Sequence, residues 1–239
     1  MNQGVYPLAA SMVNQVNRLD MISNNLANMN SFGFKQEAMV EGTFNKYLEK
    51  ENASRNVNSE NRILNDIPKL SAKYIDQTNG PIVQTQNELD FSLNKPDLFF
   101  KVQDQNGDIV YTRNGAFKSS DGFLSDAFGN TVLNADNEPI VLEGNVAENL
   151  GIVRIDFQNL EALGESKYML KPNTNIEEIM ADPITFVNQG SVEKSNVNPV
   201  RAMVDLIDAQ RRFEQSQKAI TTIDQLNGSL IEKIGSNTK

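Results

Sequence analysis

Apolar residues near the start of the chain recur with a helical period. From Val5 to Met29 they step by three and four residues, and only Gln15 interrupts the series. This spacing predicts a helix within residues 1–30 that carries one narrow apolar seam, as in coiled coils. Pro7 fits only near a helix start, so we expect the ordered helix to begin there. The predicted seam residues are Leu8, Met12, Leu19, Ile22, Leu26 and Met29.

The last two turns of this predicted helix are unusually rich in asparagine, a poor helix former. Asn24 and Asn25 fall in mid-turn, where their amides favour hydrogen bonds to neighbouring subunits. Asn28 and Asn30 leave two possibilities open, since they can cap the final carbonyl groups or bond between subunits. Gly33 then ends the helix, because it can adopt the left-handed cap conformation.

A second and longer helix is predicted over residues 197–235. Asn196 or Asn198 can cap it, Pro199 suits its first turn and Gly235 marks its end. At ~1.5 Å per residue it would be roughly 50–60 Å long. Its steps of four and three include Ala202, Leu206, Ala209, Phe213, Ser216, Ile220, Ile223, Asn227, Leu230 and Ile234. A second stripe is expected to widen the apolar face at the start: Val200, Met203, Val204 and Ile207.

Between the helices the pattern changes to short apolar runs separated by turns. Within residues 98–133, turn signals recur every seven or eight residues and predict an antiparallel meander. The four signals are Asn106-Gly107, Asn114-Gly115, Asp121-Gly122 and Gly129-Asn130. Further strands are predicted within 151–157 and 166–171, and 175–183 suits a short helix or a turn.

These patterns predict an α+β fold in which the N- and C-terminal helices pair as a coiled coil around an inserted, mainly antiparallel β domain. The helical domain is expected to comprise residues 1–35 and 197–239, and the β-rich domain residues 76–196. Residues 36–75 are polar and without a clear period, so they are interpreted as an extended connector with room for one short strand from Lys69 to Ile75.

Composition narrows the function classes. The net charge of −9 argues against nucleic acid as a partner, because phosphate binding favours a basic surface. The chain has no cysteine and no histidine, which removes the commonest nucleophiles, bases and metal ligands, so we expect no enzyme, metal or cofactor. No apolar run is long enough for membrane insertion, and the N-terminus lacks the pattern of a cleaved secretory signal.

A narrow seam must bury its apolar side against another helix. If the two terminal helices pair with each other, much of each helix surface remains for neighbouring copies, which suggests a polymer with its chain ends inside. Two other hypotheses stay open at this point. One is an enzyme that uses carboxylates in the β domain, and the other is a coiled-coil adaptor or surface protein that forms a discrete oligomer.

Three stretches of the chain are long enough to serve as family signatures. The first is LDMISNNLANMNSFGFK at 19–35, and the second is LFFKVQDQNGDIVYTRNGAFKSSDGFL at 98–124. The third is GSVEKSNVNPVRAMVDLIDAQRRFEQSQKAI at 190–220. All three resemble signatures of the bacterial flagellar rod and hook axial proteins. Details such as Ala202 and Arg212-Phe213 are more similar to the proximal rod subunit than to the distal one, whereas the N-terminal stretch is more similar to the distal form.

The resemblance implies a structural subunit of the rod that carries torque across the periplasm, or alternatively a hook-type or distal rod subunit. It also implies an inner coiled-coil layer of terminal helices with the β-rich domain outside. The implied partners are copies of the chain, other rod and hook axial proteins, and the flagellar type III export apparatus, which needs no cleaved signal.

Overall fold

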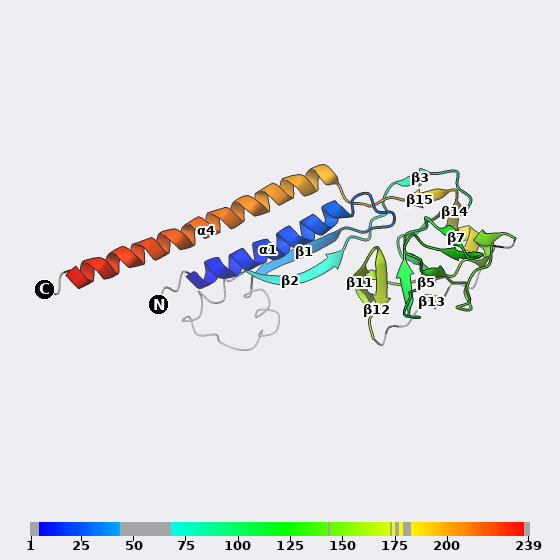
Figure 1. Ribbon diagram of the computed structural model, residues 1–239, viewed down its shortest axis with the longest axis horizontal. Coiled ribbons are helices and arrows are strands. Elements are labelled where there is room, and N and C mark those ends of the chain that lie inside the picture. Colours follow the sequence, from blue (N-terminus) through cyan, green and yellow to red (C-terminus); the bar gives the residue numbers. More distant parts are fainter. Residues whose placement is uncertain are drawn as a thin grey trace, which may run out of the picture. The chain divides into compact units, whose positions relative to one another are not determined.

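The chain forms two long helices and a set of short antiparallel strands, so the predicted α+β class is confirmed. This computed structural model describes residues 5–43, 68–142, 144–172, 174, 177–178 and 183–236. Contacts divide the chain into two units (Figure 1). One contains α1 (Val5–Ala27), β1 (Glu37–Thr43), β2 (Pro68–Ile75) and α4 (Pro199–Ser236), and the other contains the remaining strands together with residues 27–36.

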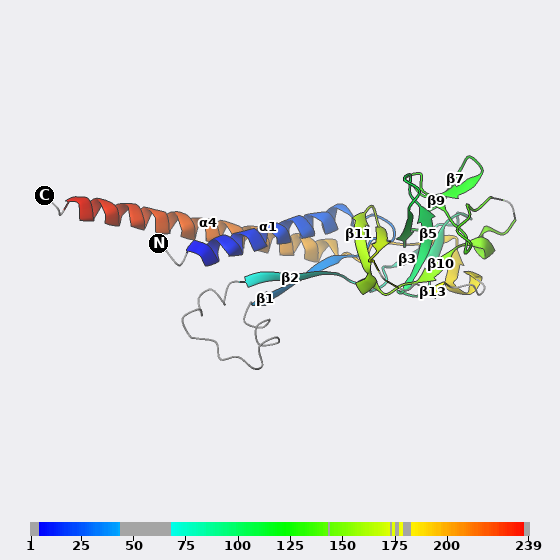
Figure 2. The same ribbon diagram turned by 90° about the horizontal axis from the view of Figure 1, so that it is seen from below.

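In the first unit, β1 and β2 pair as a two-stranded sheet, and both views draw this ribbon along α1 (Figure 1; Figure 2). The expected connector therefore contains two strands, and the predicted strand from Lys69 to Ile75 is confirmed as part of β2. Helix α1 ends at Ala27, earlier than expected, and residues 28–30 form a turn. Asn28 contributes to this turn, because its side chain accepts a hydrogen bond from the Ser31 hydroxyl at 3.2 Å.

The second unit is built on a nine-stranded sheet in which every strand pair is antiparallel, with two small sheets beside it. The strand order along the main path is β11-β12-β6-β5-β9-β8-β7, and β10 pairs with β5 and β13. The small sheets pair β14 with β4 and β15 with β3. The bounds are β3 Ile82–Gln84, β4 Phe91–Leu93, β5 Leu98–Gln103, β6 Ile109–Thr112, β7 Lys118–Ser120, β8 Phe123–Ser125, β9 Thr131–Val132, η2 Val146–Asn149, β10 Ile152–Arg154, η3 Phe157–Asn159, β11 Leu160–Gly164, β12 Lys167–Leu170, β13 Glu177–Glu178, η4 Pro183–Phe186, β14 Val187–Gln189 and β15 Ser191–Glu193.

Strand β5 has apolar neighbours on both faces, which explains why its sequence is almost continuously apolar. Successive strand residues point to opposite faces of a sheet. Accordingly, Leu98, Phe100 and Val102 belong to one buried cluster, while Phe99 belongs to a second cluster with Phe157 and others. Phe99 meets the Phe157 ring edge-on with centroids 5.0 Å apart. The core of this unit therefore lies on both sides of β5.

Three of the four predicted turns are confirmed, and the fourth is wrong. Gly107, Gly122 and Gly129 each have a positive φ in turns between paired strands. The Asn114-Gly115 pair does not join a hairpin, because β6 pairs with β5 and β12 rather than with β7. Glycine is needed at 115 for a different reason: an added Cβ would come within 1.8 Å of the Phe91 carbonyl oxygen. The predicted helix or turn at 175–183 is wrong at Glu177 and Glu178, which form β13, whereas Pro183 begins the 3-10 helix η4.

Candidate assembly surfaces and a buried ion cluster

The predicted seam of α4 is its least exposed side. Ala202 and Ala209 are buried, while Leu206, Phe213, Ile220 and Ile223 are half-buried. Leu230, further along the seam, is 56% exposed, and the side chain of Ile234 lies outside the described residues. The seam is thus covered along most of the helix but not at its C-terminal end.

The sequence suggested that the second apolar stripe of α4 widens the seam, and this prediction is wrong. Val200, Met203, Val204 and Ile207 are 47–71% exposed. Because each helical residue turns by about 100°, Val200 lies roughly 160° around the helix from Ala202. The stripe therefore occupies the opposite side of α4, and we call these four residues the α4 outer patch.

The burial of side chains on α1 also follows the predicted seam. Ile22 is buried, and Leu8, Met12, Leu19 and Leu26 are half-buried. Met29 is half-buried but lies in the turn beyond the helix, so it is not a helical seam residue. Val13 and Val16 are 60% and 42% exposed on the outer side.

The polar member of the α1 seam, Gln15, is enclosed by protein. Only 7% of it is exposed, and its Oε1 atom has no hydrogen-bond partner among the described residues. An unpaired buried amide oxygen costs about 1–3 kcal/mol. Gln15 therefore lowers the stability of an otherwise apolar seam.

Asn25 has a role within the chain that the sequence did not indicate. Its Nδ2 donates to the Glu37 carbonyl at 2.7 Å, and its Oδ1 accepts from the Glu37 N–H at 2.9 Å. The amide that was expected to bond a neighbouring subunit is thus used to hold the start of β1 against α1. Asn24 and Asn30 are exposed.

Gly33 has the predicted positive φ, at 67°, but it does not cap the helix, which ends at Ala27. Its N–H donates to the Glu193 carbonyl at 2.8 Å. A Cβ on Gly33 would lie 2.4 Å from the backbone of Arg113 and Asn114. The glycine is therefore required for the close approach of three chain segments.

The same three segments supply a buried ion cluster that the sequence did not predict. The Glu193 carboxylate accepts from Lys35 Nζ at 2.7 Å through Oε1, and from Arg113 Nε at 2.8 Å and Nη2 at 2.6 Å through Oε2. All three side chains are at most 1% exposed. The three side chains also bind backbone groups. Arg113 Nη1 donates to the carbonyls of Lys95, Pro96 and Leu98. Lys35 Nζ donates to the Thr78 carbonyl, and the Glu193 carboxylate accepts from the Gly80 N–H.

Asn196 adds neutral hydrogen bonds next to this cluster. Its Oδ1 accepts from the Gln36 N–H at 2.7 Å, and its Nδ2 donates to the Asp76 and Thr78 carbonyls, each at 3.1 Å. These hydrogen bonds join the segment after α1 to the segment before α4, and both to the residues that follow β2. No local pattern could have indicated this, because each member is an ordinary polar residue on its own.

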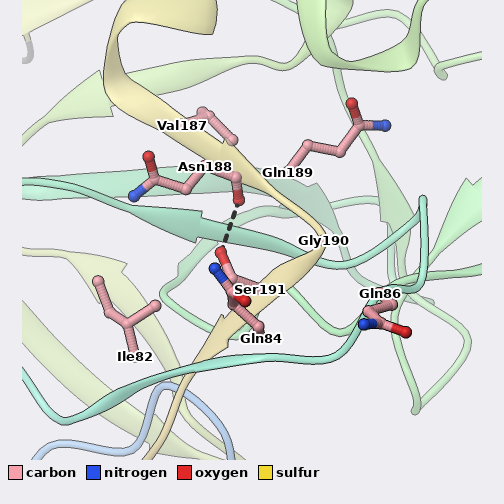
Figure 3. A pocket seen from close by; sticks show the side chains of 8 residues that line it. All are labelled: Ile82, Gln84, Gln86, Val187, Asn188, Gln189, Gly190 and Ser191. Carbon is pink, nitrogen blue, oxygen red and sulfur yellow. Dashed lines mark hydrogen bonds between the residues drawn. The ribbon is translucent and has the colours of Figure 1, made fainter.

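Two surface hollows lie among the strands. The larger, of about 670 Å³, lies where β14 turns into β15 at Gly190. Figure 3 shows uncharged amide side chains around it, with Gln84 and Gln86 on one side and Asn188 and Gln189 on the other. The second hollow, of about 370 Å³, contains Asp97, which is paired with Arg154 at 2.8 Å.

Within the described part of the chain, no group of three or more acidic side chains is placed to hold a metal ion. Its helices also include none that is long and apolar enough to span a bilayer.

Comparison with known families matches three separate parts of the chain. Residues 11–35 match the flagella basal body rod protein family, and 97–194 match the D1 domain of the flagellar hook protein FlgE/F/G family. Residues 188–233 match the C-terminal domain of the flagellar basal body rod FlgEFG proteins. The chain belongs to the flagellar basal-body rod protein family.

Whole-length relatives of this rod family support the assignment. The flagellar basal-body rod protein FlgF of Buchnera aphidicola subsp. Schizaphis graminum is 27% identical over 94% of this chain and 95% of its own. The rod protein FlgG of Agrobacterium fabrum is 29% identical over 94% and 96%. The flagellar hook-basal body complex protein FlhP of Bacillus subtilis is 26% identical over 92% and 95%.

The ion cluster connects the three parts of the chain that match rod families. Lys35 ends the first matched part, Arg113 lies in the second, and Glu193 lies where the second and third overlap. The short rod-family motifs FGFK, YTR and SVEKSN thus meet at one buried carboxylate.

The cluster has two cations around one anion, and this affects Lys35. The pKa of Lys35 is lowered from 10.5 to about 8, mainly by burial and also by the Arg113 charge, while the Glu193 carboxylate acts in the opposite direction. Between about pH 8 and pH 10.5, Lys35 keeps its proton in the unfolded chain but has largely lost it in the folded chain, so the unfolded chain binds more protons. We therefore expect the free energy of unfolding to rise with pH from about 8 to 10.5, by up to about 3 kcal/mol.

Urea unfolding at several pH values, for the native chain and Lys35→Met, measures this effect. When the free energy of unfolding is plotted against pH, the slopes for the two proteins should differ only above about pH 8. Below that pH, Lys35 is protonated in both the folded and the unfolded state. Parallel plots of the free energy of unfolding against pH over the whole range would contradict the lowered pKa of Lys35.

Proposed function

We propose that this chain is a structural subunit of the bacterial flagellar basal-body rod, which polymerises through its terminal helices into a tubular drive shaft that transmits torque across the periplasm. Three family matches and relatives named as basal-body rod proteins support the rod role. The resemblance to the proximal rod subunit gives the proposed position within the rod.

The observation that carries the polymer is the surface of α4. This helix has 38 residues, a length of about 57 Å, and apolar side chains on two opposite sides at its start. A helix side that carries apolar residues is stabilised by packing against another element, so both sides of this end of α4 favour cover. In the proposed rod, the seams of α1 and α4 pair as a coiled coil, and neighbouring subunits cover the outer sides.

The proposed partners are copies of this chain and other rod and hook axial proteins. Delivery to the rod would occur through the flagellar type III export apparatus, without a cleaved signal. The β-rich unit has its own two apolar clusters and would form the outer part of the shaft.

The proposal is tested in a motile strain whose chromosomal copy is replaced by Leu26→Asp. A carboxylate in a packed helix contact costs several kcal/mol. Because Leu26 is already half-buried in the chain and belongs to the seam, we expect swimming in soft agar to be lost, and electron microscopy of basal bodies to show incomplete rods.

Ser23→Asp is the matched control, since it adds the same charge three residues away at an exposed site, and it should keep motility. Normal swimming of the Leu26→Asp strain would refute the seam assignment. A deletion strain with complete rods would refute the rod role itself, and a discrete soluble oligomer in place of a shaft would favour the adaptor alternative.

A further inference from the structure

Both terminal helices carry an apolar surface on the side away from the seam. On α4 this is the outer patch of Val200, Met203, Val204 and Ile207. On α1 it consists of the exposed residues Ala9, Val13 and Val16, which we call the α1 outer patch. Exposed apolar surfaces that lie next to each other on a protein commonly mark protein–protein contacts.

We propose that the α4 outer patch of one copy docks against the α1 outer patch of a second copy. The inference rests on the proposed rod function and specifies which surfaces join consecutive subunits. It leaves the seams to contacts within a subunit.

The spacing of the two patches supports their pairing. Ala9, Val13 and Val16 step by four and three residues, and so do Val200, Val204 and Ile207. Helices with apolar residues at this common spacing can interdigitate their side chains over about two turns. The patches are also of similar length, so neither leaves a large part of the other uncovered.

The growth of a filament requires two different surfaces. If the α4 outer patch paired with itself, the contact would have twofold symmetry and would stop at a dimer. A contact between unlike patches leaves one free patch at each end of the pair, so that further copies can add. One chain with two unlike apolar patches meets this requirement.

The charges at the ends of the patches are complementary. On α1, Asp20 follows Val16 by one turn on the outer side and is exposed. On α4, the exposed Arg211 lies one turn beyond Ile207 at the corresponding end of the patch. If the two helices run parallel, Asp20 lies next to Arg211, which favours this pairing over contact between like patches.

Cysteine cross-linking in assembled basal bodies tests the contact, because the chain contains no cysteine of its own. The double variant Val13→Cys/Val204→Cys is expressed in place of the native protein, and basal bodies are isolated, oxidised and separated on non-reducing gels. We expect a ladder of dimers, trimers and longer chains that collapses on reduction, since each subunit would be linked to two neighbours.

The controls separate this pairing from chance contacts. Val204→Cys alone should give no ladder and no dimer. Val13→Cys/Ser229→Cys should give none either, because Ser229 is exposed on nearly the same side of α4 but about 37 Å further along. Dimers from Val204→Cys alone would overturn the proposal in favour of like-patch contact, and a double variant without a ladder would overturn it outright. Absence of the protein from isolated basal bodies would instead refute the rod function.

Discussion

Glu193→Gln is expected to lower the free energy of unfolding by about 3–5 kcal/mol. The substitution keeps the size of the side chain and removes the carboxylate that pairs with both buried cations. Breaking a buried ion pair on one side has this cost because the remaining charge stays out of water. The new amide group would also place N–H donors against the donors of Lys35 or Arg113.

Urea unfolding of the purified chain measures this loss, with Glu161→Gln as the control at an exposed strand position. The control should change stability by less than about 0.5 kcal/mol. Adding Lys35→Met to Glu193→Gln removes one of the two excess charges, so the double variant should lose less than the two single variants together. A Glu193→Gln protein as stable as the control would contradict a structural role for the cluster.

Gly33→Ala is expected to lower the free energy of unfolding by about 2–5 kcal/mol. Two causes add: a residue with Cβ costs about 1–2 kcal/mol in the left-handed conformation, and overpacking costs about 1–3 kcal/mol. The second cause arises because the added carbon would meet the Arg113 and Asn114 backbone at 2.4 Å, and backbone cannot move aside as a flexible side chain would.

Gly107→Ala separates these two causes. Gly107 has a φ of 87°, but a Cβ there would meet nothing within 4 Å. It should therefore show the conformational cost alone, about 1–2 kcal/mol. If Gly33→Ala costs no more than Gly107→Ala, the close approach at Gly33 is not needed for stability. Urea unfolding of both variants under identical conditions makes the comparison.

These two predictions concern the place where both helices join the strand-rich unit. Residues 27–36 follow α1, and Glu193 precedes α4 by six residues. A fully buried cluster with hydrogen bonds to several backbone carbonyls fixes the residues that follow α1 and those that precede α4 against the strands. We therefore expect the loss of Glu193 or Gly33 to impair motility even where the chain is still exported.

The helices and most strands could be predicted because their signals are local. The rotation per residue in a helix is constant, so steps of three and four at Leu206, Phe213 and Ile220 identify one side of α4 without knowledge of its partner. Asp121-Gly122 likewise specifies a turn through the conformations its own residues adopt. Gly115 does not follow such a local rule, because its requirement comes from Phe91, which is distant in sequence.

The sequence by itself determined the two seams, the antiparallel β structure and the family. Only the tertiary structure decided that Lys35 and Glu193, 158 residues apart, share one buried contact with Arg113, and that Asn25 binds β1 of its own chain. It also showed that the second stripe of α4 is exposed. Periodicity reports which sides of a helix are apolar, but whether a side is covered, and which charges meet, depends on how distant segments pack.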